Sequence, residues 1–188
     1  MTFPFSPLRM FGYDIIDVDP PTPFNLYSEK GAEKSAASHY SLMSWDALGR
    51  LPVGHLARAN ALLLLWACAP TLPMSIRLME SWGALYKTDL VWRKVTKNGK
   101  PRMGPGYRAR TLHEHVLVGV FGDGPQIHKP FPSLFDGVAR EHSRKPDEYY
   151  RMVVERTLGL DRCCLFARET RPGFEGWGLE AGKFDAVA

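Results

Sequence analysis

The chain has 188 residues and a mass of 21.2 kDa, which is enough for a domain with its own hydrophobic core. Hydrophobic residues make up 45% of the chain and charged residues 23%, proportions that exclude a wholly disordered protein. The formal net charge of +4 permits a polyanionic partner without requiring one. We expect a single domain over residues 1–188.

The cysteines and the apolar runs bear on metal binding, membrane insertion and the cellular compartment of the protein. Cys68, Cys163 and Cys164 show no spacing typical of a zinc site, so no metal site is predicted. The longest apolar run, residues 61–69, is too short to cross a bilayer. The N-terminus lacks the pattern of a signal peptide. We therefore expect no membrane partner and a location in the reducing cytoplasm.

The first half of the chain predicts two buried strands with a helix after each. Residues 13–18 form a short β-branched run that must end at a double proline. Residues 21–44 have no apolar period and predict a surface loop, after which Ser44 fits the N-cap of a short helix. Residues 61–67 are continuously apolar, as in a strand buried on both faces. Residues 70–82 carry apolar side chains at helical spacing.

The second half of the chain continues the alternation of strands and helices. Residues 94–111 are rich in glycine and lysine and predict a flexible loop, and residues 122–133 are turn-like. Pro146 and the acidic residues after it fit the first turn of a helix that reaches about residue 157. Further strand candidates cover residues 85–93, 113–121 and 163–167. Together these elements predict a three-layer α/β fold with a largely parallel sheet.

A stiff polar turn follows the first predicted strand. Asp19 is followed by Pro20 and Pro21, and in a parallel sheet ligands bind beyond the carboxyl ends of the strands. A rigid turn there can present one carboxylate and one carbonyl at a fixed spacing, and each can accept one N–H of an exocyclic amine. Taken alone, the tripeptide is better explained as an ordinary strand-ending turn.

Two further polar segments are candidates for binding a small molecule. Residues 140–148 read REHSRKPDE and place basic groups before a helix N-terminus, which attracts anions. Lys145 is therefore a candidate to hold a carboxylate, although a solvated charge run also fits. Arg168 ends the last predicted strand, and Glu180 follows in a glycine-rich turn. An arginine donor and a carboxylate acceptor suit a nucleoside, but this signal alone is weak.

Residues 93–110 contain seven basic residues and no acidic residue. Lysine and arginine at this density favour phosphate contacts over a merely solvated loop, and a mobile loop could close over a nucleotide that has been flipped out of its stack. The candidate nucleic-acid-binding residues are Lys94, Lys97, Lys100, Arg102, Tyr107, Arg108 and Arg110.

In this order, the motifs resemble the MT-A70 family of adenine N6-methyltransferases, particularly its short bacterial and phage branch. Asp19-Pro20-Pro21 is similar to the family's DPPW motif, and residues 63–67 (LLLWA) to its buried strand. Glu114-His115 is similar to the start of its EHxLVG strand, and residues 140–148 to its R-x-H-S-x-K-P-D-E segment. The resemblance extends over nearly the whole chain.

The resemblance implies a Rossmann-like fold with permuted motif order and transfer of a methyl group from S-adenosylmethionine to N6 of adenine. It favours DNA over RNA as the substrate, a bacterial or phage origin, and a possible homo- or heterodimer. The implied catalytic motif is Asp19, Pro20, Pro21 and Thr22. The implied cofactor-binding residues are Asp19, Lys145, Phe166, Arg168, Leu179 and Glu180.

Two positions depart from the family's pattern. Thr22 stands where the motif has tryptophan, and Leu179 stands where the late element has an amide. An aromatic ring at the first position stacks on the extruded base, which is worth roughly 1–3 kcal/mol in single-strand complexes. A catalytically silent homologue that binds nucleic acid or a partner therefore stays open as an alternative, and RNA methylation is a second one.

Overall fold

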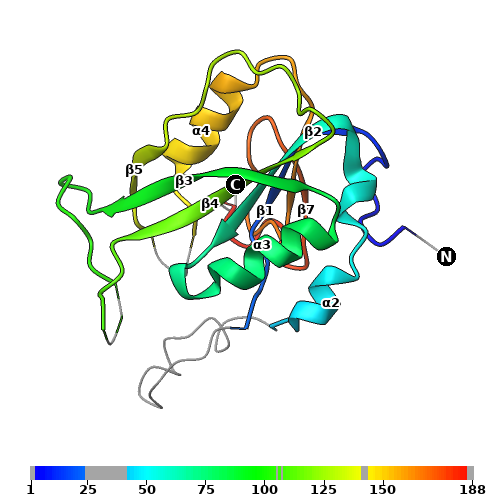
Figure 1. The fold of residues 1–188 in the computed structure, drawn as a ribbon. Helices are drawn as coiled ribbons and strands as arrows, with labels where there is room; N and C mark the ends of the chain where they lie inside the picture. Colours follow the sequence, from blue (N-terminus) through cyan, green and yellow to red (C-terminus); the bar gives the residue numbers. More distant parts are fainter. Residues whose placement is uncertain (1–2, 24–41, 105, 107, 141–143, 186–188) are drawn as a thin grey trace.

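The protein is described by a computed structural model that covers residues 3–23, 42–104, 106, 108–140 and 144–185. Within these residues, seven strands form one sheet in the order β5-β3-β4-β2-β1-β6-β7 (Figure 1). The strands are β1 (Tyr13–Val18), β2 (Ala57–Ala67), β3 (Leu85–Val95), β4 (His113–Phe121), β5 (Leu134–Val138), β6 (Arg162–Leu165) and β7 (Glu175–Trp177). The α-helices are α2 (Trp45–Gly49), α3 (Leu72–Ser81) and α4 (Asp147–Arg156), and short 3-10 turns cover Val53–Leu56 and Ala69–Thr71.

The sheet is mostly parallel, as predicted. Strand β1 lies between β2 and β6 and runs parallel to both, and the pairs β3–β5 and β6–β7 are also parallel. Strand β4 differs, because it runs antiparallel to both β2 and β3. The chain returns from β3 to β4 without a crossover helix, and such a direct return gives antiparallel neighbours.

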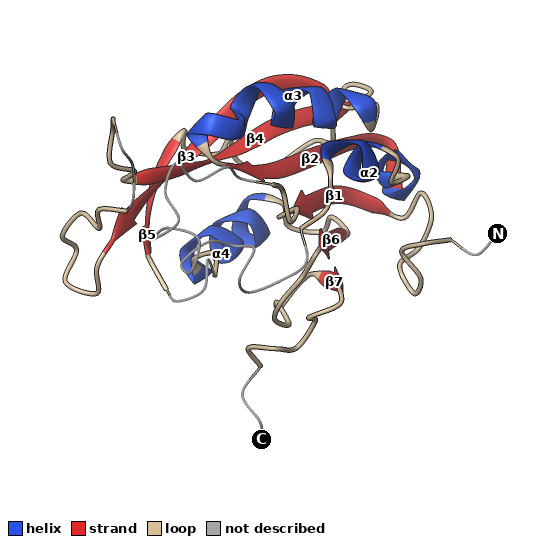
Figure 2. Ribbon diagram, turned by 90° about the horizontal axis from the view of Figure 1, so that it is seen from below, coloured by secondary structure: helices blue, strands red, loops and turns tan. Residues whose placement is uncertain are grey.

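Helices cover both faces of the sheet, with α2 and α3 on one side and α4 on the other (Figure 2). Alternate side chains of β1 point to these two layers: Ile16 packs in the core beneath α2 and α3, and Ile15 packs in the core beneath α4. Residues 61–67 of β2 are buried on both faces and are continuously apolar rather than alternating, whereas β1 is equally buried but carries Asp14 and Asp17 among its apolar residues.

Local signals in the sequence account for the helix ends. Ser44 caps α2 by accepting a hydrogen bond from the backbone N–H of Ala47 at 3.2 Å. The Trp82 indole, just after α3, donates to the Leu48 carbonyl at 2.9 Å and so ties α3 to α2. Pro146 occupies the N-cap of α4, one position earlier than predicted, and two acidic residues occupy the first turn.

The structure corrects several predicted boundaries. Strand β6 ends at Leu165 rather than at residue 167, because Phe166 adopts a φ of 59° that cannot continue a ladder. Strand β2 begins earlier than predicted, and β5 and β7 were not predicted. Most of the loop predicted over residues 21–44 lies outside the described residues. No helix in the described part of the chain is long and apolar enough to cross a membrane.

Candidate active site

The Asp-Pro-Pro turn lies at the carboxyl end of the central strand β1, where the sequence places it. The Asp19 N–H donates to the Leu165 carbonyl of β6 at 3.5 Å, and the Pro20 carbonyl accepts the N–H of Thr22 at 2.8 Å. The second bond closes a three-residue turn that fixes the direction of the Pro20 carbonyl. A carbonyl has two lone pairs, so this oxygen keeps capacity for one more donor.

Lys145 reaches the turn from the segment that precedes α4. Its ammonium lies 3.0 Å from Asp19 Oδ1 and 3.1 Å from Glu114 Oε2. The side chain is buried, and its Nζ lies 4.9 Å from the centre of the Trp66 ring. Lys145 and Asp19, which the sequence proposes as separate site residues, thus lie in direct contact, and Glu114 is an additional member of the cluster.

Glu114 is the site residue that the sequence analysis did not assign to a role. It is buried on β4, and its Oε1 lies 2.5 Å from the Lys94 ammonium. Asp19, Lys145, Glu114 and Lys94 therefore form one chain of alternating charges, which runs from the turn after β1 through the segment before α4 to β4 and β3. The sequence feature that could have identified Glu114 is that it is an isolated acid inside an apolar strand. Lys94, a predicted phosphate contact, is engaged with Glu114.

Burial and pairing set the proton affinities in this chain of charges. Burial raises the pKa of Asp19 above its ordinary value, and Lys145 opposes that shift. Burial alone would also raise the pKa of Glu114, but Lys145 and Lys94 outweigh it and lower the pKa. For Lys145, burial lowers the pKa, whereas Asp19 and Glu114 raise it more strongly. Lys145 therefore stays cationic at neutral pH.

A pocket opens next to Asp19 and Lys145. Its lining includes four cationic and two anionic side chains, so it suits a ligand that carries both positive and negative groups. Four of the six predicted cofactor-binding residues lie in this lining, whereas Leu179 is fully exposed. Glu180 bonds Arg168 at 2.9 Å without lining the pocket itself. The lining residues are Asp19, Arg144, Lys145, Tyr150, Cys164, Phe166, Ala167, Arg168, Glu169 and Arg171.

Three arginines converge on Glu169 at the side of this pocket. Arg144 lies 2.5 Å from Glu169, Arg140 lies 3.4 Å from it, and Arg171 also pairs with it. Arg140 additionally donates to the Lys145 carbonyl at 2.8 Å. This cluster holds the backbone of Lys145 in place. Glu169 and Arg171, one and three residues after the predicted Arg168, were not predicted as site residues.

The loop between β3 and β4 carries the other predicted binding residues. Lys97, Lys100, Arg102, Arg108 and Arg110 are exposed, whereas Tyr107 lies outside the described residues. A groove runs between this loop and the segment after β5, and it shares Arg144 with the pocket. The groove is lined by Thr96, Lys97, Arg102, Val138, Ala139, Arg140 and Arg144. The basic loop and the pocket are therefore neighbours.

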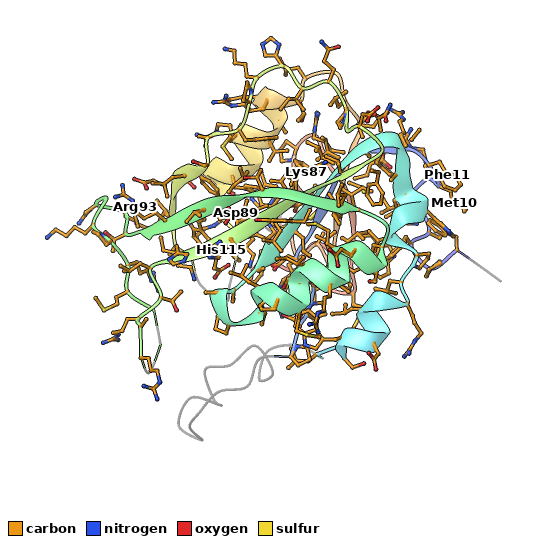
Figure 3. All side chains as sticks on the ribbon, viewed as in Figure 1. Met10, Phe11, Lys87, Asp89, Arg93 and His115 are labelled. Carbon is orange, nitrogen blue, oxygen red and sulfur yellow. The ribbon has the colours of Figure 1, made fainter. Side chains whose placement is uncertain are left out.

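The histidine beside Glu114 belongs to the other face of the sheet. His115 Nδ1 lies 2.7 Å from Asp89 Oδ2, and the two side chains lie together on adjacent strands (Figure 3). Because side chains alternate along a strand, His115 points away from the face that carries Glu114. Arg93, farther along β3, pairs with Asp136. Among the described residues, no group of three or more His, Cys, Asp or Glu side chains is placed to hold a metal ion.

Comparison with known proteins agrees with the family resemblance of the sequence motifs. Residues 13–180 match the model of the MT-A70 family. The type II methyltransferase M.MunI of Mycoplasma sp is 30% identical over 198 residues, covering 95% of this chain and 81% of that protein. A putative N(6)-adenosine-methyltransferase MT-A70-like protein of Medicago truncatula is 26% identical, and the match covers 66% of this chain and 22% of that protein. The N(6)-adenine-specific methyltransferase METTL4 of Mus musculus is 25% identical, over 92% and 38% respectively.

Proposed function

This chain belongs to the MT-A70 family of adenine N6-methyltransferases, and we propose that it methylates adenine in DNA with S-adenosylmethionine as the methyl donor. The observation that carries the proposal is the Asp19–Lys145–Glu114 cluster at the end of β1, beside a pocket of mixed charge. The similarity to the Mycoplasma type II methyltransferase supports DNA as the substrate. That relative also supports a cytoplasmic location in a bacterium or phage-infected cell.

The side chains that line the pocket next to Asp19 support S-adenosylmethionine as its ligand, which would supply an electrophilic methyl group. Lys145, which is cationic and lines the pocket, would hold its carboxylate. Arg168, also in the lining, would donate hydrogen bonds to its adenosine part. Phe166, also in the lining, offers an aromatic surface for its adenine. Glu180 would act through Arg168, to which it is bonded, and the exposed Leu179 would contribute no polar contact.

Asp19 and Pro20 would hold the target amine. A carboxylate has about four lone-pair sites, so Asp19 can keep its bond to Lys145 and still accept one N–H of N6. The Pro20 carbonyl, whose direction the bond from Thr22 fixes, would accept the other N–H. With both protons held, the nitrogen lone pair points away from the turn, toward the methyl group. Asp19, whose pKa burial raises, is also suited to accept the proton that N6 releases.

The basic loop would bind the phosphate backbone beside the flipped base. Lys97, Lys100 and Arg102 are exposed on the loop, and the groove next to it adjoins the pocket at Arg144. Phosphates are bound by lysine and arginine with release of counterions. The fold proposed from the family is a permuted, Rossmann-like methyltransferase fold of one domain. Dimerisation with a second copy or a related chain stays a prediction.

The test is methyl transfer from labelled S-adenosylmethionine to double-stranded DNA, single-stranded DNA and RNA of matched sequence, followed by nucleoside analysis. We expect N6-methyladenine in DNA, and no label in control oligonucleotides without adenine. Label in RNA alone would replace DNA by RNA as the substrate. No transfer to any oligonucleotide that binds, in the presence of bound cofactor, would identify a catalytically silent homologue, the reading that Thr22 and Leu179 favour.

A further inference from the structure

A second carboxylate lies directly beneath the proposed active site, and the roles given above do not use it. Asp17 precedes Asp19 by two residues and is completely buried on β1. Side chains two residues apart on a strand share a face, so both acids point toward the layer of α4. Burial raises the pKa of Asp17 to about 6, although hydrogen bonds from Tyr149 and Cys164 oppose the shift. A carboxylate in this environment destabilises the fold unless it is paired.

The partner of Asp17 lies on the helix that follows Lys145. The Tyr149 hydroxyl donates to Asp17 Oδ1 at 2.6 Å, and the Cys164 thiol donates to Oδ2 at 3.3 Å. Tyr149 is completely buried in the first turn of α4, and its N–H donates to the Pro146 carbonyl at 3.2 Å. A bond to Tyr149 therefore fixes the start of α4, where the chain passes from Lys145 into the helix.

The two contacts between β1 and the start of α4 also share one aromatic side chain. The ring of Trp66 lies 4.7 Å from that of Tyr149, measured between centroids, and Lys145 Nζ lies 4.9 Å from the centre of the same ring. The Asp17–Tyr149 bond and the Asp19–Lys145 ion pair thus lie one above the other, separated by two residues of β1, or roughly 7 Å. A displacement at Tyr149 would change where Lys145 meets Asp19.

We infer that the hydrogen bond between Asp17 and Tyr149 sets the position of Lys145 relative to Asp19, which makes Asp17 and Tyr149 positioning residues for methyl transfer. The inference rests on the roles proposed above for Asp19 and Lys145. Asp17 and Tyr149 themselves touch no substrate in this account. They act by fixing the distance between β1 and the start of α4. The Asp19 carboxylate then keeps its ion pair with Lys145 and the orientation in which it accepts an N–H of the target amine.

The test removes the bond from either end in the full-length protein and measures kcat and KM for DNA. Tyr149→Phe deletes only the hydroxyl, Asp17→Leu keeps the branched shape but replaces both acceptor oxygens by larger methyl groups, and Asp17→Asn retains an acceptor oxygen at similar volume. Because a misplacement of about 1 Å at a reacting centre can cost roughly 100-fold in rate, we expect Tyr149→Phe and Asp17→Leu to lower kcat about 10-fold or more. KM for DNA should change less than about twofold, and Asp17→Asn should retain most of kcat.

Tyr13→Phe is the matched control. Tyr13 is an equally buried tyrosine on β1, but its hydroxyl bonds Glu175 at 2.5 Å, away from the site. This variant should lose stability as Tyr149→Phe does and keep kcat. The inference is overturned if Tyr149→Phe keeps full kcat, or if both tyrosine variants lose kcat equally. Full activity in Asp19→Ala would instead overturn the proposed site, and the positioning role with it.

Discussion

At the scale of single residues, the proposed active site is organised by a carboxylate and an ammonium 3.0 Å apart, those of Asp19 and Lys145. Glu114 holds Lys145 from the opposite side at 3.1 Å, so the ammonium is fixed between two acids. Thr22 contributes its backbone N–H to the Pro20 carbonyl. The side chain at position 22 is therefore free to vary without loss of the turn, and the family's stacking ring can be replaced here by a small residue.

Restoring the ring at position 22 should strengthen capture of the base. Thr22→Trp keeps the backbone bond and adds a stacking surface, and such stacking is worth roughly 1–3 kcal/mol. We expect KM for single-stranded DNA to fall by about fivefold or more, since 1 kcal/mol corresponds to about a fivefold change in affinity. Thr22→Val, which changes the side chain without adding a ring, is the control. An unchanged KM in Thr22→Trp would mean that the base does not stack at this position.

The buried Asp17 should leave a signature in the pH dependence of stability. Its pKa is about 6 in the folded protein and about 3.9 in an unfolded chain, so between these values the folded state binds more protons. The destabilising effect of the carboxylate is therefore complete above pH 6 and is relieved as the pH falls toward 4.

Asp17→Asn removes this titration, so the variant and the wild type should respond differently to acid. From pH 7 to pH 4, the free energy of unfolding of the wild type should gain about 2 kcal/mol relative to Asp17→Asn. Urea unfolding of both proteins at several pH values measures the difference. A difference that stays constant across this range would show that Asp17 does not titrate with a raised pKa.

At the scale of elements, the site depends on how α4 starts. Gly137 on β5 lets this start lie close, because a Cβ at that position would come within 2.6 Å of Pro146. The Trp92 indole donates to the Gly137 carbonyl at 2.9 Å, which fastens β5 to β3. Together with the Asp17–Tyr149 bond, these contacts place Lys145 over the end of β1.

The loop between β3 and β4 is the element that should determine the salt dependence of DNA binding. Replacing Lys97, Lys100 and Arg102 by Gln should flatten the slope of log affinity against log salt by about 2–3 units, at roughly 0.9 per phosphate contact on duplex DNA. Fluorescence anisotropy across a salt series measures the slope.

A triple variant on other exposed positions serves as the control for this loop. Arg50, Arg77 and Lys87 are exposed basic residues that lie outside the loop, and their replacement by Gln changes the net charge equally. The slope of this control should match the wild type. Equal flattening in both triple variants would show that the loop makes no specific phosphate contacts and that net charge alone matters.

The elements that the sequence predicted are those with a strong local pattern. The apolar run of residues 61–67 identified the buried part of β2, and Ser44 identified the start of α2. Strand β5 was missed because Asp136 and Gly137 interrupt its apolar pattern, and β7 has only three residues. The antiparallel direction of β4 depends on pairing between segments that are distant in sequence. No local sequence pattern predicts such pairing.

The same distinction holds for the active site. Asp19, Lys145 and Arg168 were predicted from motifs, and the structure places them around one pocket. Glu114 lies on a different strand and meets Lys145 only through sheet register. Tyr149 is close to Lys145 in sequence, but its bond to Asp17 on β1 depends on how α4 packs against the sheet. The effects of Glu114 and Tyr149 on the pKa and the position of Lys145 can therefore be found only from the structure.

At the scale of the whole molecule, a cluster of ion pairs and the proposed active site lie at opposite ends of the parallel strands. Asp14, Arg58 and Asp161 form ion pairs at the amino ends of β1, β2 and β6, with Arg58 2.6 Å from Asp14 and 2.5 Å from Asp161. The carboxyl ends carry Asp19 and the pocket. This separation is typical of open α/β sheets, in which ligands bind beyond the carboxyl ends.

Single-turnover methyl transfer by the wild type and Asp19→Ala tests this account most directly, with cofactor affinity measured in parallel by calorimetry. The wild type should convert adenine in DNA to N6-methyladenine. Asp19→Ala should react about 100- to 1,000-fold more slowly, as expected for the loss of one preorganised polar partner, while its affinity for S-adenosylmethionine falls far less. An Asp19→Ala variant as fast as the wild type would contradict the account and place the chemistry elsewhere.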